Sequence, residues 1–143
     1  MRFATAVALS LLISACSNSA EEELKNQYVE NYIQSTTPLF LERLKERADE
    51  LEMSRAQLLS LTQTANERIE KMAQCSYLAY QGYPKRYHDA MIDSVAHGND
   101  VQASREKVRL MIEQDMHKGL ILQDQIIESA RKVRHVLNDC MAS

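Results

Sequence analysis

The residues from Ser54 to Tyr80, SRAQLLSLTQTANERIEKMAQCSYLAY, decide the fold class. Apolar or small side chains recur in this stretch every three or four residues, which places them on one face of an α-helix. They are Leu58, Leu61, Ala65, Ile69, Met72 and Ser76. Ser54 and Gln57 are typical of a capping box, and Gly82-Tyr83-Pro84 ends the pattern. We therefore predict one long helix here.

The rest of the chain also favours helices. Three glycines and two prolines are too few for the many turns of a β-sandwich or barrel, and no alternating strand pattern is visible. Apolar spacing predicts further helices over about 21–36, 38–51, 85–97, 100–118 and 120–141. Thr37-Pro38 separates the first two, and the second carries Leu41, Leu44, Ala48 and Leu51 on its buried face. The expected fold is all-α, a single helical bundle of five or six helices.

The first sixteen residues are typical of an export signal. Arg2 precedes a mostly apolar run from Phe3 to Ala15, which is shorter than the ~20 apolar residues of a membrane-spanning helix. The run ends in Ile13-Ser14-Ala15-Cys16, which resembles the lipobox of bacterial lipoproteins. The resemblance implies cleavage before Cys16 and lipidation of its thiol. It makes residues 1–15 a lipoprotein signal peptide and 16–23 a lipidated tether, followed by a helical domain over 24–141.

The same resemblance implies where the chain is placed. Two acyl chains hold a protein stably on a membrane without a spanning helix. Ser17 stands where enterobacterial lipoproteins retained at the inner membrane carry Asp. We therefore expect the periplasmic face of the outer membrane, with the inner membrane as the alternative.

Cys75 and Cys140 are the two cysteines that lipidation does not use. An even pair of cysteines in an exported protein predicts a disulfide, because the periplasm is oxidising. Two buried thiols are the alternative. A bond between these residues would pin the last helix along the longest one.

No residue set after Cys16 identifies a chemistry. The sequence has no Gly-rich phosphate loop, no GxSxG and no SxxK, and its four histidines lack the spacing of a zinc site. We expect no enzymatic activity, no metal and no cofactor. Removal of residues 1–15 leaves 128 residues with a net charge of −4 and no long basic block, so we expect no nucleic acid as a partner.

Tyrosines and basic residues gather around residues 77–88. Tyrosine and arginine are common hot-spot residues of protein interfaces. The candidate protein-binding surface consists of Tyr77, Tyr80, Tyr83, Lys85, Arg86 and Tyr87. The alternative is that these rings pack the corner between two helices, with each hydroxyl bound to water or a carbonyl.

These features favour a lipid-anchored, non-enzymatic adaptor or assembly factor that binds another protein of the cell envelope. In layout the chain is similar to the pilotins of type II secretion, small helical lipoproteins with a disulfide that escort channel subunits to the outer membrane. Two alternatives stay open. One is a periplasmic lipoprotein that binds a small ligand or a metal, and the other is an inhibitor of a periplasmic hydrolase.

Overall fold

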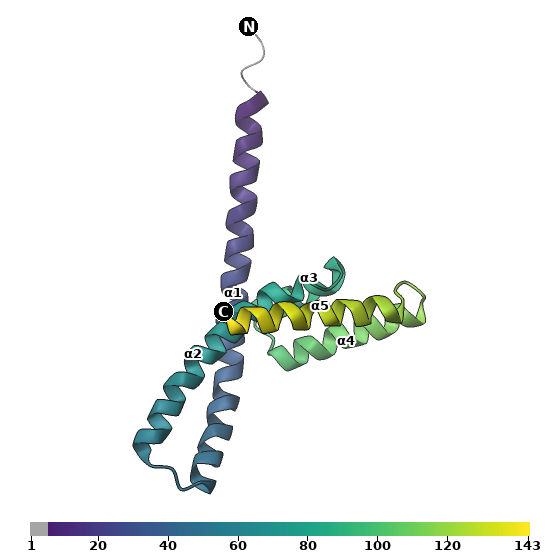
Figure 1. The fold of residues 1–143 in the computed structure, drawn as a ribbon. Helices are drawn as coiled ribbons and strands as arrows, with labels where there is room; N and C mark the ends of the chain where they lie inside the picture. The colour runs from purple at the N-terminus through teal and green to yellow at the C-terminus, as the bar shows by residue number, and fades with distance from the viewer. Residues whose placement is uncertain (1–5) are drawn as a thin grey trace.

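The computed structural model describes the backbone of residues 6–143 and the side chains from residue 19 onward. Within these residues the chain forms five α-helices and no strand, which confirms the predicted fold class. They are α1 (Ala6–Glu50), α2 (Arg55–Tyr80), α3 (Lys85–Ala96), α4 (Val101–His117) and α5 (Gln123–Ala142). In Figure 1, α1 stands upright, α2 folds back beside its lower part, and α3, α4 and α5 form a lobe to one side.

Residues 1–5 of the predicted signal peptide, and the side chains up to residue 18 with that of Cys16, lie outside the described part of the chain, so cleavage and lipidation stay predictions. Residues 19–23, the end of the predicted tether, are exposed and belong to α1.

The predicted break at Thr37-Pro38 is wrong, because α1 continues through Pro38 to Glu50. A proline inside a helix removes one backbone donor and crowds the preceding turn. The helix packs on α2 on both sides of this position. Tyr28 contacts Tyr77 of α2 before the proline, and the face that carries Leu41, Leu44 and Ala48 is turned inward after it. Packing along this length outweighs the local cost of the proline.

The prediction that Leu51 is buried is also wrong. Its side chain is 57% exposed. The reason is local, since α1 ends at Glu50 and the chain then turns through Glu52, whose φ is +51°. The helical spacing that would have continued the buried face therefore stops one residue before Leu51.

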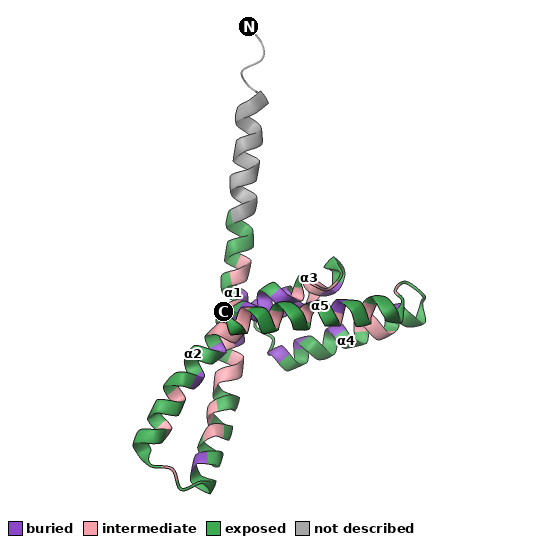
Figure 2. Cartoon of the chain, in the orientation of Figure 1, coloured by how far each residue is buried: buried purple, intermediate pink, exposed green. Residues whose placement is uncertain are grey.

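The core lies where α1, α2, α3 and α4 meet, and tyrosine rings fill much of it. Its buried members are Tyr28, Tyr32, Ala73, Tyr77, Tyr87, Met91, Ile92, Val95, Ala96, Val101 and Val108. Figure 2 shows mostly exposed residues along the hairpin arm formed by the lower part of α1 and the first half of α2. The hydrophobic core therefore stabilises the side lobe and its junction with α1 and α2, and few buried residues stabilise the arm.

Most predicted helix boundaries after residue 50 agree with the structure, but the last helix begins at Gln123 and not near Leu120. Ser54 and Gln57 form the capping box at the start of α2, and Asp100 caps α4 by accepting the Ala103 N–H at 2.8 Å. Gly98 and Gly119 end α3 and α4 with φ of +90° and +68°, values that glycine adopts without strain.

α5 is attached chiefly to α2. Cys75 and Cys140 form the predicted disulfide, with an S–S distance of 2.04 Å. Seven residues further along the chain, Gly82 lies so close to α5 that a Cβ on it would be 3.1 Å from the Val133 nitrogen. Since Val133 precedes Cys140 by the same number of residues, the end of α2 and the C-terminal half of α5 run antiparallel in contact. The N-terminal half of α5 extends past the end of α2 and faces α4 across a cleft.

Candidate binding cleft

A half-open cleft of about 580 Å³ lies between α4 and α5, with the end of α2 and part of α3 as its floor. Its walls are apolar. α4 contributes Val108, Ile112 and Met116, and α5 contributes Ile126, Ile127, Val133 and Leu137. The floor includes Ala79, Tyr80, Tyr87 and Met91. Figure 1 shows α4 and α5 running side by side along the lobe, so the cleft follows the lobe's length.

The cleft exists because two amphipathic helices do not close on each other. The apolar positions of α5 recur at helical spacing, but only Ser129 of this helix is buried. Apolar side chains also remain exposed at the mouth, where Ile127 is 47% exposed and Met116 is 37% exposed. Leu120 and Leu122 extend this apolar surface into the loop that joins the two helices, at 66% and 65% exposure. A contiguous apolar surface of this kind is typical of an interaction site.

The charged side chains that line the cleft all come from α4. Arg109 pairs with Glu106 and Glu113 on its own helix, and its hydrogen bond lowers the pKa of Glu106. Arg105 has a different setting, since its Nε–H donates to the Tyr80 hydroxyl oxygen at 3.0 Å. The cleft therefore joins a long apolar surface to one cation beside a phenol.

The structure divides the predicted protein-binding surface into three parts. Tyr77 is 4% exposed and Tyr87 is 3% exposed. Both rings are buried in the core and are therefore not available to a partner as surface residues. Tyr77 is turned toward α1, where its ring centroid lies 5.6 Å from that of Tyr28. The hydroxyl of Tyr87 donates to the buried Asp115 at 2.8 Å.

Tyr80 and Tyr83 are half-buried and line the cleft, with their rings stacked at a centroid distance of 6.4 Å. Burial raises the pKa of Tyr83. Lys85 and Arg86 lie outside the cleft, at the exposed start of α3. Lys85 pairs with Asp89 at 2.5 Å, and Arg86 lies 3.2 Å from Asp115. Two of the six predicted residues thus line the cleft, and Tyr87 reaches the cleft floor from the core.

Sequence reasoning missed the cleft itself. The positions that line α4 and α5 have the spacing of core residues, and periodicity alone does not distinguish a buried stripe from one that lacks a partner. One feature of the sequence did indicate an uncovered surface. Every predicted helix carries an apolar face, which is more than a single core of this size can cover.

The histidines do not form a common site. His88, His97 and His135 each lie beside an aspartate of their own helix, and no group of three His, Cys, Asp or Glu side chains that could hold a metal occurs within residues 19–143. In the part of the chain that the structure describes, no helix has an apolar stretch long enough to cross a bilayer.

No protein-family model matches the chain, and neither a curated protein nor a solved structure shows significant similarity to it.

Proposed function

We propose that this chain is a lipid-anchored periplasmic adaptor that binds an amphipathic helix of another envelope protein in the cleft between α4 and α5. The observation that carries the proposal is the cleft, because its apolar walls come from two helices that leave their facing stripes uncovered. An amphipathic helix that lays its apolar face into such a groove is a recurring mode of protein recognition.

The dimensions of the cleft support a helical partner. The α4 wall extends from Arg105 to Met116 and the α5 wall from Gln123 to Leu137. At ~1.5 Å per residue the α4 wall is about 16 Å long and the α5 wall about 21 Å long, which matches three to four turns of a bound helix. The exposed Leu120 and Leu122 continue this surface beyond one end.

The predicted anchor supports an adaptor role. A protein held by acyl chains at Cys16 stays at the membrane surface, where it meets partners that are inserted in the same membrane or on their way to it. We propose the outer membrane as that location, on the ground of Ser17 after the lipidated cysteine. The proposed role is non-enzymatic, with binding and placement as its two parts.

One observation favours a second candidate, the binding of a small apolar ligand. A volume of about 580 Å³ lies within the ~300–1,000 Å³ range of small-molecule pockets. However, such pockets bury most of their ligand, whereas this cleft is half-open and carries exposed apolar side chains at its mouth. The open mouth therefore favours a protein partner.

Photo-crosslinking in cells tests the proposal with matched positions. A photo-reactive amino acid replaces Ile127, which lines the cleft, or Val136, which is 39% exposed on the same helix but does not line it. We expect discrete protein adducts from residue 127 and not from residue 136. Identical adducts from both positions, or none from residue 127, would overturn the proposal.

A second pair of variants tests whether the adducts depend on the cleft. Met116→Glu places a charge in the cleft wall, and Leu110→Glu places one on an exposed part of α4 outside it. We expect Met116→Glu to remove the adducts from residue 127 and Leu110→Glu to leave them. Circular dichroism checks that both variants stay helical.

A further inference from the structure

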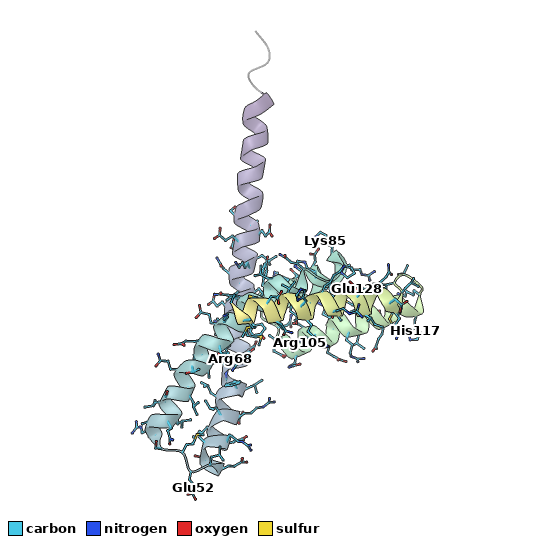
Figure 3. All side chains as sticks on the ribbon, in the orientation of Figure 1. Glu52, Arg68, Lys85, Arg105, His117 and Glu128 are labelled. Atoms are coloured by element: carbon cyan, nitrogen blue, oxygen red, sulfur yellow. A yellow bond between two sulfur atoms is a disulfide. The ribbon has the colours of Figure 1, made fainter. Side chains whose placement is uncertain are left out.

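The charges near the cleft are unequally distributed between its two ends. Arg109 is neutralised by two glutamates of α4. Arg105, nearer the start of the helix, forms no ion pair with any carboxylate among the residues whose side chains the structure describes. Figure 3 shows Arg105 toward the α1 end of the lobe and His117 at the far tip. The end of the cleft near α1 is therefore the cationic end.

A second arginine strengthens this asymmetry. Arg105 also lines a smaller cavity of about 170 Å³ between α1 and the start of α4, and Arg43 of α1 lines the same cavity. Within residues 19–143, Arg43 has no ion-pair partner either. The carboxylate in this cavity belongs to Asp100, which is already engaged as the cap of α4. The guanidinium groups of Arg43 and Arg105 thus share a cavity with one carboxylate, that of Asp100, which already accepts a hydrogen bond from the backbone of α4.

The geometry of Arg105 suits it to recognise a carboxylate. Its Nε–H is directed to the Tyr80 hydroxyl, which fixes the guanidinium plane and leaves the terminal nitrogens available for a further acceptor. A guanidinium group offers paired donors that match the two oxygens of a carboxylate. A partial apolar surrounding strengthens such a pair relative to one in open water.

We infer that the partner helix carries an acidic side chain at one end of its apolar face, and that this side chain pairs with Arg105. The inference rests on the proposed adaptor function, whose partner class it specifies. The apolar walls of the cleft bind an apolar stripe of three to four turns on the partner helix, and Arg105 fixes which end of that helix lies against α1. Arg43 adds long-range attraction for the same acidic end.

Designed peptides test the inference without knowledge of the natural partner. Two fluorescent amphipathic helices share an apolar stripe over three to four turns and differ only in Glu or Gln at one end of it. Their affinities are measured by fluorescence anisotropy for the full lipidated chain in phosphatidylcholine nanodiscs, with empty nanodiscs subtracted. We expect the Glu peptide to bind roughly five- to tenfold more tightly at low salt. This preference should shrink as ionic strength rises.

Variants of α4 identify the residue responsible. Arg105→Gln should remove the preference for Glu over Gln, and Arg105→Glu should transfer it to a peptide with Lys at that position. Lys107→Gln is the matched control, since Lys107 is an exposed cation of the same helix that does not line the cleft, and it should leave the preference unchanged.

The outcomes separate this inference from the function on which it rests. Equal binding of the Glu and Gln peptides would overturn the role of Arg105. The cleft would still be supported as the site if Met116→Glu abolished the binding of both peptides and Leu110→Glu did not. A preference that survives Arg105→Gln would also overturn the inference. Failure of every peptide to bind, or binding indifferent to Met116→Glu, would overturn both proposals.

Discussion

The hydroxyl of Tyr87 on α3 donates a 2.8 Å hydrogen bond to Asp115 on α4, whose side chain is 3% exposed. Arg86 approaches the same carboxylate to 3.2 Å from the solvent side. A buried carboxylate requires such partners, because its desolvation is otherwise costly. The contact fixes the first turn of α3 to the last turns of α4 and so sets the position of the α4 wall over the cleft floor. Burial and the bond to Asp115 raise the pKa of Tyr87.

We predict that Tyr87→Phe lowers the free energy of unfolding by about 1–3 kcal/mol, because Asp115 loses one of its donors while it stays buried. Urea denaturation followed by circular dichroism measures the loss. Tyr83→Phe is the control, since Tyr83 is half-buried in the cleft wall and its hydroxyl does not bond to Asp115. Equal losses in the two variants would contradict the importance of this hydrogen bond.

Removal of the disulfide should release α5. Cys75 and Cys140 are 65 residues apart, and the chain-entropy relation for a loop of that size gives about 4 kcal/mol. We expect Cys75→Ser with Cys140→Ser to lose about that much stability. Because α5 packs mainly on α2, its amides should also exchange with deuterium faster than those of α3. Uniform exchange across all helices of the double variant would show that other contacts hold α5 in place.

Most helix boundaries were predictable because local rules decide them, and the disulfide was predictable from the cysteine count. The side chains of Ser54, Gln57 and Asp100 bond to backbone groups three residues away, and Gly98 and Gly119 act through their own φ angles. The sequence alone therefore indicates what these residues do. The pairing of Cys75 with Cys140 required only an even count of cysteines once Cys16 was assigned to lipid.

The cleft and the continuity of α1 depend on tertiary packing, which local patterns do not contain. Tyr77 and Tyr80 are three residues apart on one helix, yet Tyr77 is buried against α1 and Tyr80 lines the cleft. Nothing in their spacing distinguishes the two, because the difference comes from where α1 and α5 cross α2. The same reasoning explains why the apolar spacing over 120–141 predicts a helix but does not reveal that its apolar face stays half-exposed.

A side chain at Gly82 should destabilise the contact between α2 and α5. A Cβ there would lie 3.1 Å from the Val133 nitrogen and 3.2 Å from Lys132 Cβ, both in α5. We predict that Gly82→Ala costs about 1–3 kcal/mol, because α5 must shift away from the end of α2. Denaturation measures this cost, and faster amide exchange in α5 locates it.

Gly98→Ala is the control for Gly82→Ala, since a Cβ on Gly98 would meet nothing within 4 Å and only the φ of +90° opposes the substitution. Its cost should be about 1 kcal/mol and confined to the end of α3. Faster exchange in α5 after Gly98→Ala would contradict this division between steric and backbone effects.

Asp89 should make stability depend weakly on pH. Hydrogen bonds from Lys85 and His88 lower the pKa of its carboxyl group below the usual range. A carboxyl whose pKa is lower in the folded state adds stability above its unfolded pKa, about 3.9, and this stability is lost as the pH falls through the folded pKa. We therefore expect Asp89→Asn to be slightly less stable than wild type at pH 7. This difference should start to shrink as the pH falls below about 4 and disappear once the pH is below the folded pKa. A difference that persists at pH 2 would contradict this assignment.

Pro38 should be the residue of α1 whose replacement stabilises the protein most. It lies inside a helix that continues to Glu50, it is exposed, and it has no N–H for the carbonyl of Gln34. Pro38→Ala restores that bond and removes the clash with the preceding turn. The gain should reach about 2–3 kcal/mol after the greater chain entropy of the unfolded variant is taken into account.

Pro84→Ala is the matched control, because Pro84 directly precedes the first residue of α3, where a proline does not interrupt a helix. It should give no gain, or a small loss through the entropy of the unfolded chain. Equilibrium denaturation of both variants measures the contrast. A gain in stability for Pro38→Ala alone is expected if packing on α2 keeps α1 continuous across residue 38. Equal effects of the two substitutions would instead favour two separate helices on either side of Thr37-Pro38.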